Sequence, residues 1–356
     1  MLSRVADSLY WMGRYLERAE NTARFLDVNW HLTLDMAMRQ QSHWSALVSV
    51  SGDKGLYKSL YDDDTKDNVI RFLTIDSSYP NSIWSCLNQA RDNARAVRDL
   101  IPLEMWELIN VFFHRIDKEA TNPVEVFNNP YTFCDEVKKA NHALTGLAND
   151  SMDHDEAWHF LNLGRMLERA DKTSRILDVK YFVLLPEVED VGAVIDTVQW
   201  AALLKATSSF QAYRHRVGKI TPRGVARFML MSHSFPRSVL YSLTEAQRLL
   251  HYITRTRIGY FSNDAEKLLG QLCAELSFHS IEDIMEQGLH EFTDHLQQKM
   301  NEIDVAIFNL GAYEPRWFMA GSHINPAETV RAFRELRAKK LMIVHWGTIQ
   351  LGDEPV

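Results

Sequence analysis

The sequence contains few cysteines and no long apolar run. Its 356 residues include three cysteines, Cys86, Cys134 and Cys273, which lie far apart and are odd in number. This usage indicates reduced thiols and not a disulfide framework. No apolar stretch approaches the roughly eighteen residues that a membrane-spanning helix needs, and the amino-terminal stretch carries Arg4 and Asp7 where a secretion signal has an apolar core. We therefore expect a soluble, cytoplasmic protein with no membrane partner.

An excess of positive charge is also missing. The formal net charge is -8 and the isoelectric point is near 6.0, which argues against a general nucleic-acid binder. No Cys-x-x-Cys pair, phosphate-binding loop, Gly-x-Ser-x-Gly elbow or dinucleotide fingerprint occurs. The sequence therefore predicts no cofactor and no nucleic-acid partner.

What the sequence does contain is a long motif that occurs twice. Residues 13–28 read GRYLERAENTARFLDV, and residues 164–179, which begin 151 positions later, read GRMLERADKTSRILDV. Further along, the two halves align again at an offset of 156 positions, as in Trp44 and Trp200. A spaced pattern of this length does not recur through composition alone. We interpret the chain as a tandem duplication.

The duplication predicts the fold class and the domain boundaries. Apolar side chains recur every three or four residues over 3–35, which is typical of a long amphipathic helix. Other segments with this spacing are 81–101, 104–117, 129–149, 237–257, 263–275 and 281–302. The sequence predicts an all-α, tandem-duplicated helical bundle with five or six helices in each half, the first at 1–150 and the second at 151–302, packed about a pseudo-twofold axis.

The pattern changes at Ile303. The segments IDVAIFNLG and LMIVHWG are typical of buried strands, and residues 326–338 are typical of a helix. The pattern therefore predicts a small C-terminal βαβ-like segment at residues 303–356. Two explanations of its origin stay open: the segment is a real fusion, or the chain is chimeric.

The first part of the chain resembles a known family. The repeated Gly-Arg-x-Leu-Glu-Arg-Ala block, with YPNSIWSCL, FPRSVLYSL, LEMWELIN and YRHRVGK, resembles the bacterial alpha-E family over 1–302. Glu17, Arg18, Glu168 and Arg169 match its Glu-Arg motif. The resemblance implies an all-α fold and, from the gene neighbourhood in that family, an ATP-grasp-type ligase of peptides or amides, or a transglutaminase-like protein, as partner. It supplies no activity.

The last part of the chain resembles a different family. GAYEPRWFM, His323-Ile-Asn-Pro and Val344-His-Trp-Gly look like the end of a metallo-β-lactamase-fold phosphodiesterase of the N-acylphosphatidylethanolamine phospholipase D type. This resemblance implies that His345 matches a metal ligand and that His323 lies beside the active site. The family's main metal-binding run, His-x-His-x-Asp-His, does not occur in the sequence. A catalytic zinc needs about three protein ligands, so we expect no bound metal.

Two arginines stand one helical turn apart in both copies of the motif, Arg14 with Arg18 and Arg165 with Arg169. Such pairs cost a solvated helix about 0.3 kcal/mol each, so some other interaction must offset the repulsion twice. The favoured interpretation is an ion-pair network that fixes how the halves dock. The alternative is that the two sets converge as a site for a carboxylate or phosphate, where Arg side chains bind with two hydrogen bonds. The candidate ligand- or partner-binding residues are Arg14, Glu17, Arg18, Arg165, Glu168 and Arg169.

Two further clusters allow a functional interpretation. The most basic stretch comprises Tyr213, Arg214, His215, Arg216, Lys219 and Arg223. A solvated loop is favoured there over a site for RNA or phosphate. The pairs His154 with His159 and His290 with His295 are five residues apart, which turns the second ring off the face of the first. Helix capping and surface pairing are favoured over a metal site.

Together these features favour a helical accessory or adaptor protein. We expect it to act with an ATP-grasp-type ligase, to bind the partner or product through the paired Glu-Arg helices and not to be catalytic by itself. Two alternatives stay open. One is an enzyme of peptide or amide modification that uses the Arg-Glu cleft, and the other is a remnant metal-dependent hydrolase formed by the C-terminal segment. The sequence predicts neither the substrate nor the oligomeric state.

Overall fold

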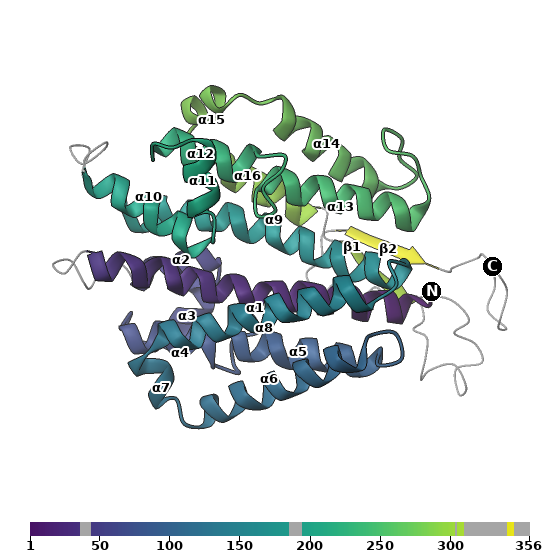
Figure 1. The fold of residues 1–356 in the computed structure, drawn as a ribbon, viewed down its shortest axis with the longest axis horizontal. Coiled ribbons are helices and arrows are strands. Elements are labelled where there is room, and N and C mark those ends of the chain that lie inside the picture. The colour runs from purple at the N-terminus through teal and green to yellow at the C-terminus, as the bar shows by residue number, and fades with distance from the viewer. Residues whose placement is uncertain (36–43, 185–193, 303–304, 310–339, 345–356) are drawn as a thin grey trace.

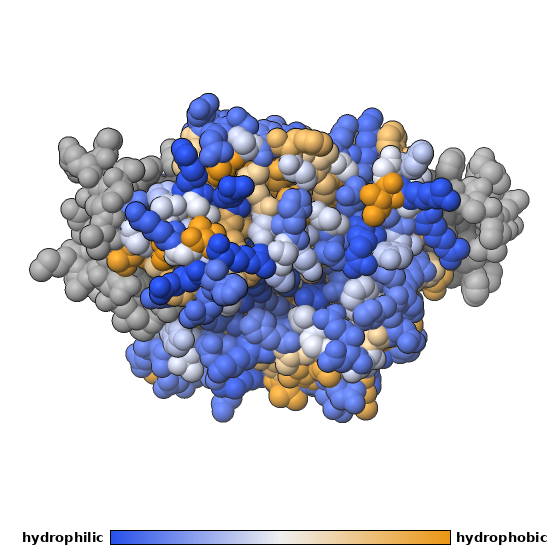
Figure 2. Space-filling view, turned by 45° about the horizontal axis from the view of Figure 1, so that its top comes forward, coloured by the Kyte–Doolittle hydropathy of each residue, from blue (hydrophilic) through white to orange (hydrophobic). Residues whose placement is uncertain are grey.

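The structure is a computed structural model, and it describes residues 1–35, 44–184, 194–302, 305–309 and 340–344. The fold is all-α, as predicted, with one pair of strands near the C-terminal end (Figure 1). None of the helices in these ranges has the length and apolar character needed to cross a bilayer. The face shown in Figure 2 is largely hydrophilic, with its apolar side chains in separate patches.

Each half of the chain forms eight helices within the described residues. The first half contains α1 (Ser3–Asp35), α2 (Trp44–Ser51), α3 (Lys54–Leu60), α4 (Lys66–Thr74), α5 (Ile83–Ala96), α6 (Leu103–Thr121), α7 (Val124–Asn128) and α8 (Pro130–Ser151). The second half contains α9 (Glu156–Leu184), α10 (Val194–Ala206), α11 (Phe210–Arg216), α12 (Pro222–Met231), α13 (Val239–Thr254), α14 (Asp264–Phe278), α15 (Ile281–Gln287) and α16 (Leu289–Glu302).

The two long helices, α1 and α9, lie side by side at the centre of the molecule (Figure 1). Helices α3 to α8 of the first half cover α1 on one side, and α13, α14 and α16 lie on the far side of α9. The second helix of each half packs across the centre, because α2 contacts α9 and α10 contacts α1. One hydrophobic core therefore runs through both halves, and the boundary at residue 150 stays a prediction.

Two glycines bring the backbones of α1 and α9 unusually close. A Cβ atom on Gly13 would lie 2.1 Å from the carbonyl oxygen of Leu161, and one on Gly164 would lie 2.1 Å from the carbonyl oxygen of Tyr10. The contact is reciprocal, since each glycine of the repeated motif faces the position three residues before its counterpart. The helices run parallel, because the terminal amine of Met1 lies 3.2 Å from Glu156 at one shared end.

Two predictions about the helices were wrong. The single helix expected over 281–302 is broken between α15 and α16 by Gly288, whose φ of +104° ends the first helix. The expected five or six helices per half are eight, because α3, α4, α7 and their counterparts are short. Segments of five to ten residues hold too few turns for apolar periodicity to show them.

The two C-terminal strands form a parallel pair. They are β1 (Val305–Asn309) and β2 (Lys340–Val344), with Val305 opposite Lys340 and Asn309 opposite Val344. β1 also contacts α1. The helix predicted at 326–338 lies outside the described residues.

We predict that Gly13→Ala and Gly164→Ala each lower the free energy of unfolding by about 2–3 kcal/mol, because the added methyl group meets a backbone carbonyl that cannot rotate away. Urea unfolding at pH 7 measures the change. Gly146→Ala is the matched control, since it lies within α8 with no atom near the new Cβ. It should raise stability by about 0.5–1 kcal/mol through helix propensity. Equal effects at the three positions would contradict the close crossing.

Candidate functional site

The Glu-Arg motifs of the two halves meet where α1 and α9 lie together. Arg169 donates from Nε and Nη2 to the two carboxylate oxygens of Glu17, both at 2.8 Å. Arg18 donates in the same way to Glu168, at 2.7 and 2.9 Å. Each motif therefore supplies the carboxylate for the other motif's arginine, in two-pronged ion pairs that favour one orientation.

Further cations surround the same two carboxylates. Arg14 donates from Nε to Glu168 at 2.6 Å, and the Lys172 ammonium lies 3.7 Å from it. On the other side of the crossing, Arg237 Nη1 lies 3.5 Å from Glu17. Each glutamate of the motif thus has more than one cationic partner.

A second carboxylate lies one turn further along each helix. Glu20 accepts from Arg24 Nε at 2.9 Å and also from Arg237. Asp171 holds the corresponding place on α9 and accepts from Arg175 Nε at 3.0 Å. Both are i, i+4 ion pairs within one helix.

Arg24 and Arg175 also reach the opposite half. Arg24 Nη1 donates to the carbonyl oxygen of Ala206 at 2.6 Å and to Ser208 Oγ at 3.0 Å. Arg175 lies against Gly52, where an added Cβ would be 3.3 Å from Nη1. Ser208 and Gly52 both have positive φ, 55° and 85°, and follow α10 and α2. The turn after each second helix is therefore packed against an arginine from the other half.

The repeated YPNS and FPRS segments place two more side chains at the site. Ser82 and Ser238 cap α5 and α13 by accepting from backbone N–H groups at 3.1 Å. The residue before each cap points to the crossing, where Asn81 accepts from Arg18 at 2.7 Å and Arg237 donates to the glutamates on α1. The two segments thus make different contacts.

The carboxyl groups at the crossing are held in the ionised form. Burial alone would raise the pKa of Glu168, but the charges of Arg18 and Arg14 outweigh it and hold that pKa well below its usual range. Burial would likewise raise the pKa of Glu17, and Arg169 lowers it. Both side chains are 0% exposed. These carboxylates are fixed counter-charges at neutral pH.

Arg165 is the exception among the candidate residues. It occupies the place in the second motif that Arg14 has in the first, but the described residues give it no ion pair with Glu17. Its Nη1 donates to Asn162 at 2.6 Å, and its Nε has no hydrogen-bond partner there although the residue is 5% exposed. Burial and the nearby charge of Arg169 lower the pKa of Arg165 to about 10.

We call this cluster the charge centre. It comprises four carboxylates, Glu17, Glu20, Glu168 and Asp171, and eight cations, Arg14, Arg18, Arg24, Arg165, Arg169, Lys172, Arg175 and Arg237. The six candidate residues are all in it. The other six members, Glu20, Arg24, Asp171, Lys172, Arg175 and Arg237, are not among the candidates. The signal for Arg237 was its place in FPRS, where the first half has Asn81.

The basic stretch differs from the loop expected there. Phe210–Arg216 forms α11, because Tyr213 is fully buried and its hydroxyl donates to the carbonyl oxygen of Lys219 at 2.9 Å. Tyr57 makes the corresponding bond to Asp63 at 2.8 Å in the first half.

The histidine pairs have structural partners. The ring of His154 stacks on Trp158 with centroids 4.0 Å apart, and that of His159 stacks on Tyr252. His290 Nδ1 lies 3.1 Å from Asp178. Among the residues that the structure describes, no group of three or more His, Cys, Asp or Glu side chains is arranged to hold a metal ion.

We predict that Glu168→Gln lowers the free energy of unfolding by about 3–5 kcal/mol, because it leaves the partly buried Arg14 and Arg18 without the fully buried carboxylate that balances their charge. Chemical denaturation at pH 7 measures the loss. The control is Glu136→Gln, which removes an exposed pair with Arg115 and should cost less than about 1 kcal/mol. A Glu168→Gln variant as stable as the control would show that the pairs do not hold the crossing together.

Comparison with known proteins matches the C-terminal part to a second family. A profile of the beta-lactamase superfamily domain matches residues 287–346. The N-acyl-phosphatidylethanolamine-hydrolyzing phospholipase D 1 of Caenorhabditis elegans is 46% identical over 55 residues, which is 15% of either chain. The mitochondrial enzyme of that name from Saccharomyces cerevisiae is 38% identical over 50 residues, 14% of this chain and 11% of the yeast protein. His323 and His345 lie outside the described residues.

The rest of the chain matches a helical family. The uncharacterized protein Mb2597 of Mycobacterium bovis is 28% identical over 259 residues, and Rv2567 of Mycobacterium tuberculosis is 27% identical over the same length. The match covers 67% of this chain but only 28% of either relative. No solved structure matches the chain. The profile of Alpha-E, described as a predicted alpha-helical domain with a conserved ER motif, matches residues 1–309. The chain, with its two Glu-Arg motifs paired across α1 and α9, therefore belongs to the Alpha-E family.

Proposed function

We propose that this protein is a helical accessory protein that acts with an ATP-grasp-type peptide or amide ligase and is not catalytic by itself. The observation that carries the proposal is the arrangement of charge at the centre. Glu17, Glu20 and Glu168 are fully buried, whereas cations such as Arg14 and Arg18 keep 13% and 15% of their side chains exposed. A partner or product that reaches the edge of the centre meets positive charge.

That charge suits the chemistry of the proposed partner system. Ligases of this class join carboxylates to amines, so their substrates and products carry carboxylate groups. Arginine binds a carboxylate through two parallel hydrogen bonds, and cations outnumber carboxylates at the centre. The proposal is therefore that the protein binds the ligase, or its carboxylate product, at the edge formed by Arg14, Arg18, Lys172 and Arg175.

The same arrangement of charges argues against an enzyme that uses Glu17 or Glu168 as a general base. A general base works best when its pKa lies near the working pH, so that it can take up and release a proton. Arg18 and Arg14 hold the pKa of Glu168 far below that range, and Arg169 lowers that of Glu17. Both carboxylates already accept several hydrogen bonds from arginine.

To test the proposal, we would mix the full chain with an ATP-grasp-type ligase from the same genome and measure the complex by sedimentation velocity. We expect a complex that Arg18→Ala weakens by about tenfold or more, because a charge-assisted contact is lost. Arg95→Ala, in an exposed pair with Asp92, should bind as the unchanged protein does.

Two results would contradict this. One is the absence of a complex with the ligase and with a transglutaminase-like protein tested in the same way. The other is an Arg18→Ala protein that is folded and binds normally. If Arg18→Ala does not fold, Arg18→Lys takes its place in the binding measurement. That variant keeps the positive charge that balances Glu168 but loses the two parallel hydrogen bonds of arginine.

A remnant metal-dependent hydrolase is the second candidate, and the match of residues 287–346 to the beta-lactamase superfamily supports it. The His-x-His-x-Asp-His run is absent from the sequence, so we predict well under one zinc, iron or manganese ion per chain. Elemental analysis of the purified full-length protein after gel filtration measures this. A stoichiometric pair of metal ions would favour the hydrolase over the accessory protein.

A further inference from the structure

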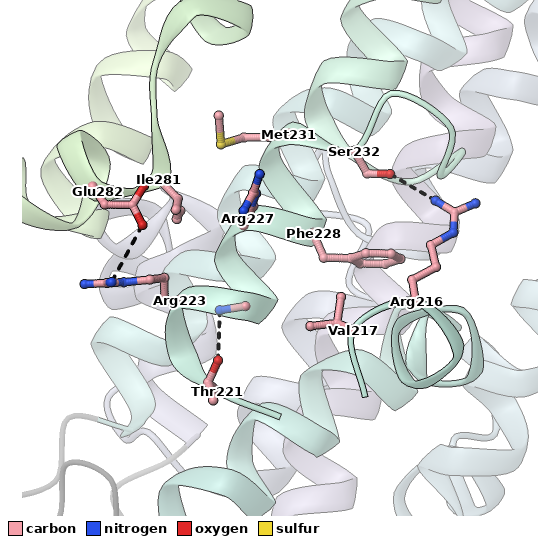
Figure 3. Close-up of a pocket in the computed structure, with 11 residues that line it drawn as sticks. Arg216, Val217, Thr221, Arg223, Arg227, Phe228, Met231, Ser232, Ile281 and Glu282 are labelled. Atoms are coloured by element: carbon pink, nitrogen blue, oxygen red, sulfur yellow. Dashed lines mark hydrogen bonds and ion pairs between the residues drawn. The ribbon is translucent and has the colours of Figure 1, made fainter. Parts of the chain in front are cut away.

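A pocket in the second half lies apart from the charge centre. It has a volume of about 430 Å³ and is formed by α11, α12 and the first turn of α15 (Figure 3). Pockets of roughly 300–1,000 Å³ are typical of small-molecule sites. The pocket is therefore large enough for a small ligand or for the end of a peptide.

The pocket combines an apolar wall with a cationic lining. Phe228 and Ile281 are buried side chains in the wall, and Val217 and Met231 add apolar surface. Three arginines also line it, against one acidic residue, Glu282. A ligand that fits both features has an apolar group and a negative charge close together.

The three arginines are not equally occupied. Arg216 Nη1 donates to Ser234 Oγ at 2.7 Å, and Arg223 Nη1 lies 3.6 Å from Glu282. In the view of Figure 3, Arg227 lies between the Arg223–Glu282 pair and Arg216. Within the described ranges, Arg227 has no ion pair or hydrogen bond through its side chain, and it is exposed. Its guanidinium is thus available to an anion in the pocket.

The matching hollow in the first half is lined by an excess of acidic residues, not of arginines. At the offset of 156, Arg227 corresponds to Arg71, which lines a hollow of about 370 Å³ together with Asp76 and Asp117. The Arg71 guanidinium lies over the ring of Phe127, 5.2 Å from its centroid. The fold therefore does not require a cluster of arginines at this place.

We infer that this pocket binds the C-terminal carboxylate of a short peptide whose last side chain is apolar. Arg227 binds the carboxylate, and Phe228, Met231 and Val217 receive the side chain. Glu282 pairs with Arg223 and so reduces the attraction of the pocket for a doubly charged phosphate. Its carboxylate can also accept from the peptide's last N–H groups. The inference goes beyond the proposed function, since it needs no ligase partner.

The test is fluorescence anisotropy of the full-length protein with a dye-labelled tetrapeptide that ends in Leu-Phe and a free carboxylate. The same peptide with a C-terminal carboxamide should bind at least about tenfold more weakly, because the charge-assisted hydrogen bonds are lost. Arg227→Ala should weaken the free acid by about tenfold or more. Arg71→Ala, the matched control, should leave binding unchanged.

Four outcomes of the binding measurements would overturn the inference. They are no binding of the free acid at about 1 mM protein, a concentration that detects even a weak complex, equal affinity for the acid and the carboxamide, normal binding by folded Arg227→Ala, and a loss in Arg71→Ala as large as in Arg227→Ala. A competition experiment gives a fifth, because it distinguishes a carboxylate site from a phosphate site. If phenyl phosphate displaces the dye-labelled peptide at lower concentration than the unlabelled peptide does, the pocket is a phosphate site and the carboxylate assignment is wrong.

Discussion

The close approach of α1 and α9 at Gly13 and Gly164 is the constraint on which the rest of the structure depends. With the backbones this near, Glu17 and Glu168 each reach an arginine of the opposite helix with two parallel hydrogen bonds. The register is fixed as well, because a shift of one residue would turn the glycines away from the carbonyls. The remaining helices pack around a pair whose relative position is already set.

Buried ion pairs of this kind specify an arrangement more than they stabilise it. Taking two charges out of water costs several kcal/mol each, and a well-formed pair roughly offsets that cost. An unpaired charge has no such offset, so any packing of the halves that separates Glu17 from Arg169 is strongly disfavoured. The favoured sequence interpretation, a network that fixes docking, agrees with the contacts. The binding role of the same residues remains a proposal that rests on the exposed edge of the centre.

Much of the fold and part of the site can be predicted from the sequence. Apolar periodicity predicts the long helices, and the repeated motif predicts which residues meet. It cannot predict that Arg165 fails to repeat the contact of Arg14, or that Arg237 reaches Glu17 from the turn before α13. When the two residues of an ion pair are far apart in the sequence, the local spacing of charges does not reveal the pair. Short helices such as α11 were missed for a similar reason, since burial of Tyr213 and not periodicity fixes them.

The two halves share their glycines and glutamates at the crossing and differ in charge on exposed turns. Gly13 and Gly164 are identical because an added Cβ would meet a backbone carbonyl, and Glu17 and Glu168 both supply a carboxylate to the arginines. Arg223 and Asp67, by contrast, are matching positions of opposite charge on exposed turns of α12 and α4. If the chain arose by duplication, charge diverged at such exposed positions and at one position of the charge centre, where Arg237 matches Asn81. We then expect chemistry that is specific to one half at the pocket of α12. The crossing of α1 and α9 holds the surrounding helices in position.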